Sequence, residues 1–177
     1  MGRSNTKIRM EFHPKKRFGQ NFLVDKNIQN KIIKAAGIKS QDVILEIGPG
    51  RGELTSLLAP LARKIIAVEI DSNLCAILKT NLGQFSGKVD IVNEDFLSFN
   101  ISRCLRAANK IKVLSNLPYY ITTPIIVRLF KFGRKIETIF ITAQKEFAQR
   151  MVAVSGTSEW SAFSCFLQYH AEAKILF

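Results

Sequence analysis

The residues in this sequence that are best suited to chemistry form one short segment, Asn116-Leu117-Pro118-Tyr119. The side-chain oxygen of Asn116 and the main-chain carbonyl of Leu117 or Pro118 can accept both hydrogens of an exocyclic amine. The ring of Tyr119 can stack on the base that carries this amine. Such a set of groups suits modification of the amino group of adenine, although an Asn-x-Pro-aromatic segment by itself is a weak signal.

The flanking residues predict where this segment lies. The apolar run 111–115 precedes it and predicts a buried strand. Thr122-Thr123-Pro124 follows it and predicts a helix start, because hydroxyl groups cap helices and proline is favoured at early helical positions. Segment 116–119 would then form a tight loop at the carboxyl end of a strand, where open α/β sheets bind ligands.

Apolar strands alternate with helices along the rest of the chain. Strands are expected at 43–47, 65–70, 89–92, 111–114 and 136–142, and residues 171–177 are expected to begin another. Helices are expected from the Asp25 cap to Gly37, at 54–62, from the Asp71 cap through Leu78, and near 144–154. This alternation predicts an α/β fold with a doubly wound, mostly parallel sheet.

A glycine-rich loop, Glu46-Ile47-Gly48-Pro49-Gly50-Arg51-Gly52, ends the first expected strand. Gly48 and Gly50 would let the main chain approach a ligand closely. Glu53 lies near the start of the next helix, where a negative charge opposes the binding of a pyrophosphate. A cofactor with an amino-acid moiety and no phosphate, S-adenosylmethionine, therefore fits better than a dinucleotide.

Two acidic residues follow the next two expected strands. Glu69 ends the second strand, a position from which a carboxylate accepts hydrogen bonds from ribose hydroxyls. Asp71 is the better helix cap, which leaves Glu69 for a ligand. Asp95 follows the third strand and could hold the amino group of the cofactor's adenine, with Phe96 beside the ring. Each feature has a simpler reading as a turn or a cap, but their order at successive strand ends favours one site.

The charge of the chain favours a polyanionic partner. It has 26 Lys and Arg against 14 Asp and Glu, a net charge of +12, which is typical of nucleic-acid binding. From Phe96 through Ile136 there are eight basic residues and no acidic one, and we expect them to flank segment 116–119. Residues 1–17 are expected to be a flexible basic arm and 18–177 a single domain. A basic surface without a partner is the simpler alternative.

Cysteine and histidine usage argues against disulfides and metal sites. Cys75, Cys104 and Cys165 are isolated and are expected to be buried, reduced thiols of a cytoplasmic protein. His13 and His170 form no ligand pair, so no metal is expected. No apolar run approaches the roughly 20 residues that a membrane-spanning helix needs, so no membrane association is expected.

Six motifs in order make the sequence resemble the ribosomal RNA adenine dimethyltransferases, in particular their small-subunit branch. They are residues 16–23, 46–52, 68–71, 94–96, 116–119 together with 121–124, and 144–150. The resemblance implies a Rossmann-like class I methyltransferase that depends on S-adenosylmethionine and releases S-adenosylhomocysteine. It implies double methylation of two adjacent adenosines near the 3′ end of small-subunit rRNA, by a monomer with a role in ribosome biogenesis.

The resemblance also implies roles for individual residues. The implied catalytic residues are Asn116, Leu117, Pro118 and Tyr119. The implied cofactor-binding residues are Asn21, Leu23, Gly48, Gly50, Glu69, Ile70, Asp95, Phe96 and Asn116. The implied RNA-binding residues are Lys16, Arg17, Phe22, Tyr119 and Tyr120.

The sequence departs from the family pattern in three places. Tyr120 stands where Asn or Gln is frequent, and Trp160-Ser161 where Tyr-Gly is usual. The family's last strand and C-terminal helical domain are expected to be absent from this chain. Two alternatives stay open: a non-catalytic RNA-binding or ribosome-assembly module on the same fold, and a nucleotide-dependent dehydrogenase, which Glu53 disfavours.

Overall fold

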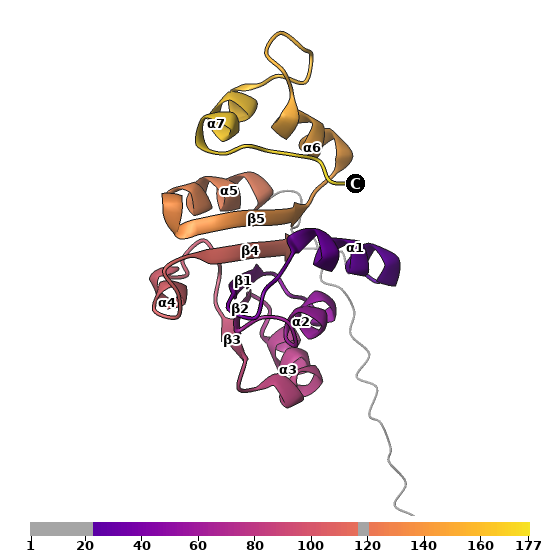
Figure 1. Ribbon diagram of the computed structural model, residues 1–177, viewed down its shortest axis with the longest axis vertical. Coiled ribbons are helices and arrows are strands. Elements are labelled where there is room, and N and C mark those ends of the chain that lie inside the picture. The colour runs from indigo at the N-terminus through magenta and orange to yellow at the C-terminus, as the bar shows by residue number, and fades with distance from the viewer. Residues whose placement is uncertain (1–22, 117–120) are drawn as a thin grey trace, which may run out of the picture.

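The computed structural model describes residues 23–116 and 121–177. Five parallel strands form one sheet in the order β3-β2-β1-β4-β5 (Figure 1). The strands are β1 (Val43–Ile47), β2 (Lys64–Glu69), β3 (Val89–Asn93), β4 (Ile111–Asn116) and β5 (Ile136–Thr142). The α-helices are α1 (Lys26–Ala36), α2 (Glu53–Leu58), α3 (Ser72–Asn81), α4 (Ser102–Leu105), α5 (Thr122–Phe130), α6 (Lys145–Val152) and α7 (Ala162–His170). Short 3₁₀ turns, η2 (Gly83–Phe85) and η4 (Gly133–Lys135), lead into β3 and β5.

Helices cover both faces of the sheet, which confirms the doubly wound arrangement. On one face Ile44 and Ile65 of the sheet pack with Leu58 of α2 and Leu78 of α3. On the other face the sheet packs against α4 and α5, through the residues Leu45, Val68, Val113, Cys104, Ile125 and Leu129. Successive residues of β1 therefore bury their side chains on opposite faces, because side chains alternate along a strand.

The five strands predicted between residues 43 and 142 and the helix caps at Asp25, Gly37 and Asp71 are confirmed, apart from shifts of one or two residues at the strand ends. The carboxylate of Asp25 accepts hydrogen bonds from the main-chain N–H groups of Asn27 and Ile28. Gly37 ends α1 in the left-handed conformation with φ of 52°. The carboxylate of Asp71 caps α3 through the N–H of Asn73. The second helix ends at Leu58, earlier than expected.

The carboxyl-terminal part of the chain differs from the expectation. Residues 171–177 form no strand, because they pair with no strand in the described part of the chain. Helix α7 was not predicted; a capping box between Ser161 and Ser164 starts it, and Phe163 packs on Phe147 of α6. The expectation that all three cysteines are buried was wrong for Cys165, which lies on the exposed face of α7.

The start of α5 also differs. Its first residue is Thr122, and the N-cap position is Ile121 rather than a threonine. The two threonines therefore lie within the first turn. Pro124 is tolerated there because the N–H groups of the first turn have no partner inside the helix.

A buried ion pair holds β4 against the turn that precedes β1. The ammonium of Lys112 lies 2.7 Å from a carboxylate oxygen of Asp42, and the two side chains are 8% and 11% exposed. Lys112 also donates to the main-chain oxygen of Gly37. Burial by itself would raise the pKa of Asp42, but the hydrogen bond and charge of Lys112 hold this pKa below its usual range.

The central strand β1 buries an acidic side chain as well. Glu46 is 2% exposed, and its Oε2 atom has no hydrogen-bond partner among the described residues. Burial raises the pKa of Glu46 to about 7, and the nearby carboxylates of Glu53 and Glu69 act in the same direction. Glu46 therefore keeps its proton to a higher pH than an exposed glutamate does.

Replacing Lys112 with Met tests the buried ion pair. The change leaves the Asp42 carboxylate buried without its cation, so we expect the free energy of unfolding to fall by about 3 kcal/mol in urea titrations. The control is Lys64→Met, which breaks the more exposed pair with Asp90 and should cost about 1 kcal/mol or less. Equal losses in the two variants would contradict a special role for Lys112.

Replacing Glu46 with Gln tests the raised pKa. The pKa of Glu46 is higher in the folded chain than in the unfolded chain, so protonation of Glu46 stabilises the fold. This stabilisation is complete below about pH 4.5 and is lost as the pH rises through about 7. Relative to the unchanged chain, Glu46→Gln should gain about 2 to 3 kcal/mol in unfolding free energy between about pH 5 and pH 8. A difference that does not vary with pH would show that Glu46 titrates normally.

Candidate active site

Four of the predicted cofactor-binding residues lie along one edge of the sheet. Gly48 follows β1, Glu69 ends β2, Asp95 follows β3 and Asn116 ends β4. Since the strands are parallel and the order is β3-β2-β1-β4, their carboxyl ends form a continuous edge. The sheet therefore brings together residues that are widely separated in the sequence. In Figure 1 this is the edge toward which the arrowheads of β4 and β5 point.

The glycine loop leaves room for a ligand at one point and packs closely at another. Gly48 has φ of 66°, and its N–H donates to the main-chain oxygen of Val68. A Cβ atom built on Gly48 would meet no other atom within 4 Å. A Cβ atom on Gly52 would lie 2.9 Å from the side chain of Leu78. Gly48 thus leaves open space above the loop, and Gly52 lets the loop pack on α3.

Glu69 connects the glycine loop with the start of α3. One carboxylate oxygen accepts from the N–H of Gly50 at 3.2 Å, and the other accepts from the N–H of Asp71 at 2.9 Å. Burial raises the pKa of Glu69, while these two N–H donors oppose the rise. The sequence suggested that Glu69 is left for a ligand, but both of its carboxylate oxygens already accept a main-chain N–H group. Each oxygen still has a second lone pair that can accept a hydroxyl.

Asp95 and Phe96 are neighbours in the sequence, but the Asp95 side chain is exposed and the Phe96 side chain is buried. Asp95 is exposed, and one of its oxygens accepts from the N–H of Leu97 at 2.8 Å. Phe96 is only 5% exposed and packs in the core cluster, with the guanidinium of Arg128 5.9 Å from its ring centre. Asp95 is therefore available to a ligand, whereas Phe96 has a packing role in this structure.

Two further residues shape this part of the edge. The side-chain amide of Asn93 donates to the main-chain oxygens of Glu69 and Ile70, which ties the ends of β3 and β2 together. Ile70 is 47% exposed and offers an apolar surface between Glu69 and the end of β3. No role was predicted for Asn93; its position at the end of β3, two residues before Asp95, was the available signal.

A neighbouring strand positions Asn116. The hydroxyl of Thr142, the last residue of β5, donates to the side-chain oxygen of Asn116. The two residues are register partners in the ladder between β4 and β5. The preceding hydroxyl, that of Ser115, donates to the main-chain oxygen of Ile47 on β1. Thr142 carried no sequence signal, because only the strand order shows which residue lies beside Asn116.

Several predicted site residues lie outside the described part of the chain, so their assignments stay predictions. They are Lys16, Arg17, Asn21, Phe22, Leu117, Pro118, Tyr119 and Tyr120, together with the expected basic arm 1–17. Leu23 is described. It is half-buried just before α1, where its main-chain oxygen accepts from the side-chain amide of Gln29.

Much of the acid-free basic stretch lies at the opposite edge of the sheet. Arg106 and Lys110 precede β4, and Lys131, Arg134 and Lys135 precede β5. The expectation that these residues flank segment 116–119 was therefore wrong. The physical reason is that α5 runs back along the sheet, so that its last turn and the next strand begin at the amino edge.

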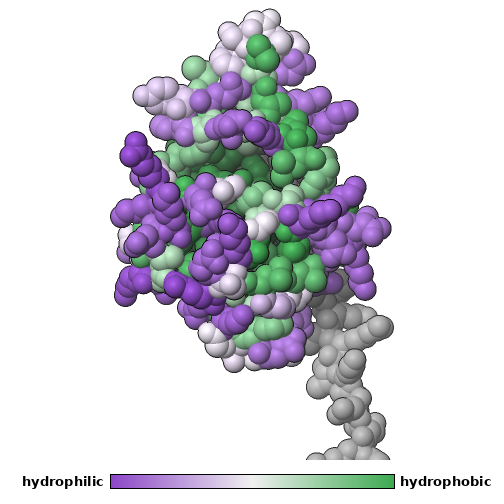
Figure 2. Space-filling model, in the orientation of Figure 1, coloured by the Kyte–Doolittle hydropathy of each residue, from purple (hydrophilic) through white to green (hydrophobic). Residues whose placement is uncertain are grey.

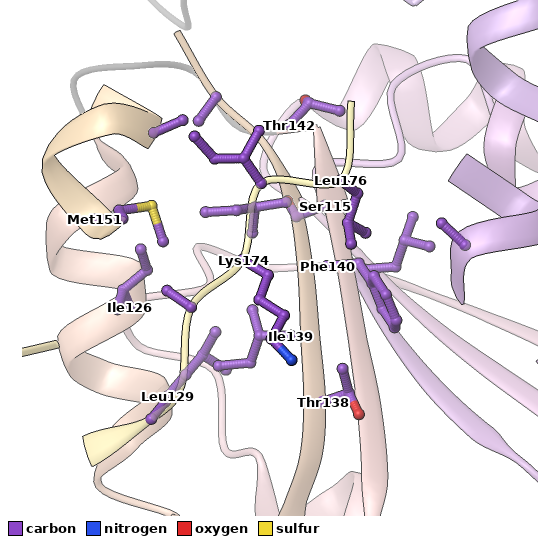
Figure 3. A pocket seen from close by; sticks show the side chains of 18 of the residues that line it. Ser115, Ile126, Leu129, Thr138, Ile139, Phe140, Thr142, Met151, Lys174 and Leu176 are labelled. Carbon is purple, nitrogen blue, oxygen red and sulfur yellow. The ribbon is translucent and has the colours of Figure 1, made fainter. Parts of the chain in front are cut away.

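An apolar cavity of about 900 Å³ lies beside β5, and Leu23, Ser115 and Thr142 are among the residues that line it. Ile126 and Leu129 of α5, Ile139 of β5 and Met151 of α6 line it, and residues 171–177 pass across it (Figure 3). Neither Glu69 nor Asp95 lines it, so the carboxylates predicted to bind the ribose and the adenine lie outside this cavity. Within residues 23–116 and 121–177 there is no cluster of metal-binding side chains and no helix long and apolar enough to cross a membrane.

The edge residues fit a nucleoside cofactor without phosphates. Glu69 and Asp95 are carboxylates, Ile70 is an exposed apolar side chain, and Gly48 leaves open space. Glu53 occupies the first turn of α2, where a phosphate would otherwise bind. S-Adenosylmethionine has ribose hydroxyls and an adenine amine that can donate hydrogen bonds to these carboxylates. It has no phosphate that Glu53 would repel.

Comparison with known proteins identifies the family of this chain. Residues 11–177 match the profile of the family described as Ribosomal RNA adenine dimethylase. Ribosomal RNA small subunit methyltransferase A of Lachnoclostridium phytofermentans is 44% identical over 95% of this chain and 59% of its own length. The protein of the same name from Clostridioides difficile is 40% identical over 91% of this chain and 56% of its own length.

Solved structures give the same result. A dimethyladenosine transferase from Plasmodium falciparum superposes with a TM-score of 0.67 and 34% identity, over 81% of this chain and 50% of that one. The 23S rRNA methyltransferase ErmE superposes with a TM-score of 0.68 and 31% identity, over 81% of this chain and 55% of that one. This chain spans between 50% and 59% of the length of these four proteins. It belongs to the ribosomal RNA adenine dimethylase family.

Proposed function

We propose that this chain is the cofactor-binding and catalytic domain of an rRNA adenine N6,N6-dimethyltransferase. The observation that carries the proposal is the common edge of Gly48, Glu69, Asp95 and Asn116, at the ends of four adjacent strands. In this proposal the substrate is small-subunit rRNA, and each of two adjacent adenosines near its 3′ end is methylated twice. The names of the relatives support the small subunit. We further propose action as a monomer in the cytoplasm, during ribosome biogenesis.

The family uses S-adenosylmethionine, which supplies the methyl group. Glu69 would accept hydrogen bonds from the ribose hydroxyls, and Asp95 from the amino group of the cofactor's adenine. Ile70 would pack against the adenine ring, and the main chain at Gly48 would approach the amino-acid moiety. With these four proposed contacts the cofactor would lie above β1 and β2, beside Asn116.

Asn116 would act on the acceptor amine. The amine of adenine is a poor nucleophile because its lone pair is delocalised into the ring. The side-chain oxygen of Asn116, oriented by Thr142, can accept a hydrogen of this amine and stabilise the positive charge that develops on nitrogen. Holding the amine in attack geometry lowers the barrier further. The main-chain carbonyl of Leu117 or Pro118 is predicted to accept the second hydrogen of the amine. The ring of Tyr119 is predicted to stack on the target base after this base has left the RNA stack.

Replacing Asn116 with Ala tests the catalytic assignment. We expect transfer of labelled methyl from S-adenosylmethionine to undermethylated small ribosomal subunits to fall at least about 100-fold, the loss typical of one transition-state hydrogen bond. Cofactor affinity in calorimetry should stay unchanged. Asn109→Ala, an exposed asparagine before β4, is the control and should retain transfer. Parallel loss of transfer and cofactor binding would make Asn116 a binding or folding residue.

The unchanged chain in the same assay tests the proposed function itself. Label recovered as dimethyladenosine supports the enzyme and shows that this chain suffices for docking. Cofactor binding without transfer, even at high enzyme concentration, would favour the non-catalytic RNA-binding alternative for this chain.

Replacing Glu69 with Gln tests the cofactor assignment. The change keeps the shape of the side chain but removes a charged acceptor, which typically contributes about 1.5 to 3 kcal/mol per hydrogen bond. We therefore expect the dissociation constant for S-adenosylmethionine to rise roughly 10- to 100-fold in calorimetry. Glu159→Gln removes an exposed carboxylate elsewhere and should have no effect. An unchanged constant for Glu69→Gln would exclude Glu69 from the cofactor site.

A further inference from the structure

The amino edge of the sheet carries a row of exposed basic side chains. Each lies in a connection that leads into a strand: Arg63 before β2, Arg106 and Lys110 before β4, and Lys131, Arg134 and Lys135 before β5. We refer to these six residues as the basic ridge. Because β2 and β5 are three strand spacings apart, the ridge is about 14 Å wide. Figure 2 shows hydrophilic residues along the left margin of the molecule, the side on which β4 and β5 begin in Figure 1.

The acidic residues at this edge are engaged by other cations. Asp42 pairs with the buried Lys112, and Asp90 pairs with Lys64, each at 2.7 Å. Glu137 lies 4.0 Å from Lys112 as well. In the described part of the chain, no residue of the basic ridge forms an ion pair. The ridge therefore has six positive charges that the fold itself does not neutralise.

An extended polyanion is the partner that fits this arrangement. The charges are spread over several connections and are all exposed, so they suit the repeated phosphates of a nucleic-acid backbone. A small anion would instead be expected in a concave site with buried donors. Six neighbouring cations repel one another in the folded chain, and a bound phosphate backbone would relieve this repulsion while it released counterions.

The ridge lies too far from Asn116 to hold the same short stretch of RNA. Strand β4 runs from Ile111 to Asn116, six residues that span roughly 20 Å. We propose that the basic ridge binds the backbone of a second RNA segment while another segment presents its adenosine at the carboxyl edge. The chain would then recognise a folded RNA with two segments placed across the sheet. The nature of this partner as RNA rests on the proposed function.

The test removes three charges of the ridge and measures binding to RNA that cannot be methylated. The variant is Lys131→Gln/Arg134→Gln/Lys135→Gln, and the probe is a fully paired RNA duplex of about 20 base pairs, without cofactor. In about 0.1 M salt we expect the dissociation constant to rise at least tenfold. The slope of log K against log salt concentration should become shallower by about two to three, close to one unit for each phosphate that the variant no longer neutralises.

A matched triple variant controls for net charge. Lys79→Gln/Lys145→Gln/Lys174→Gln removes three exposed lysines from α3, α6 and the segment after α7. We expect this variant to keep most of the affinity and of the salt slope. Equal losses in the two triple variants would overturn the proposal, because binding would then follow total charge alone. Unchanged affinity for S-adenosylmethionine in calorimetry shows that both variants are folded.

Duplex affinity that is unchanged in the ridge variant would also overturn the assignment. If this variant has at the same time lost binding to polyglutamate, the result would identify an acidic protein as the partner. Because the duplex offers no unpaired adenosine, these results do not depend on methyl transfer. A chain that binds the duplex through the ridge but transfers no methyl would refute the proposed function and leave the ridge in place.

Discussion

The ladder between β1 and β4 joins segments of the chain that are 68 residues apart, as the hydrogen bond from Ser115 to Ile47 shows. This pairing places the glycine loop, which follows β1, beside Asn116, which ends β4. The buried pair of Lys112 and Asp42 fixes the other end of the same two strands. The candidate site therefore depends on a central ladder that is fastened at both ends.

The two edges of the sheet differ in charge and in burial. The carboxyl edge contains Glu46, Glu69 and Asp95, and burial raises the pKa of the first two. The amino edge presents exposed cations without internal partners in the described part of the chain. Such a division suits a protein that binds a cationic, nucleoside-containing cofactor on one side of the sheet and phosphates on the other. It also explains why a single number, the net charge of +12, describes this surface poorly.

The comparisons and the geometry support each other at different levels. Family membership follows from the match over residues 11–177 and says nothing about individual contacts. The contacts add Thr142 as the residue that orients Asn116 and Asn93 as the residue that ties β2 to β3. Phe96 shows the reverse case, since its place beside Asp95 in the sequence suggested a ligand contact, but its ring is buried in the core.

The sequence by itself determined the five strands of the sheet, the helix caps at Asp25 and Asp71, and the presence of Gly48, Glu69, Asp95 and Asn116 at strand ends. These features are local, because they depend on periodicity and on residues a few positions apart. Only the tertiary structure decided that Thr142 reaches Asn116, that the basic residues gather at the amino edge, and that residues 171–177 form no strand. Each of these depends on which strands become neighbours and which way a helix returns, and neither is encoded in a local pattern.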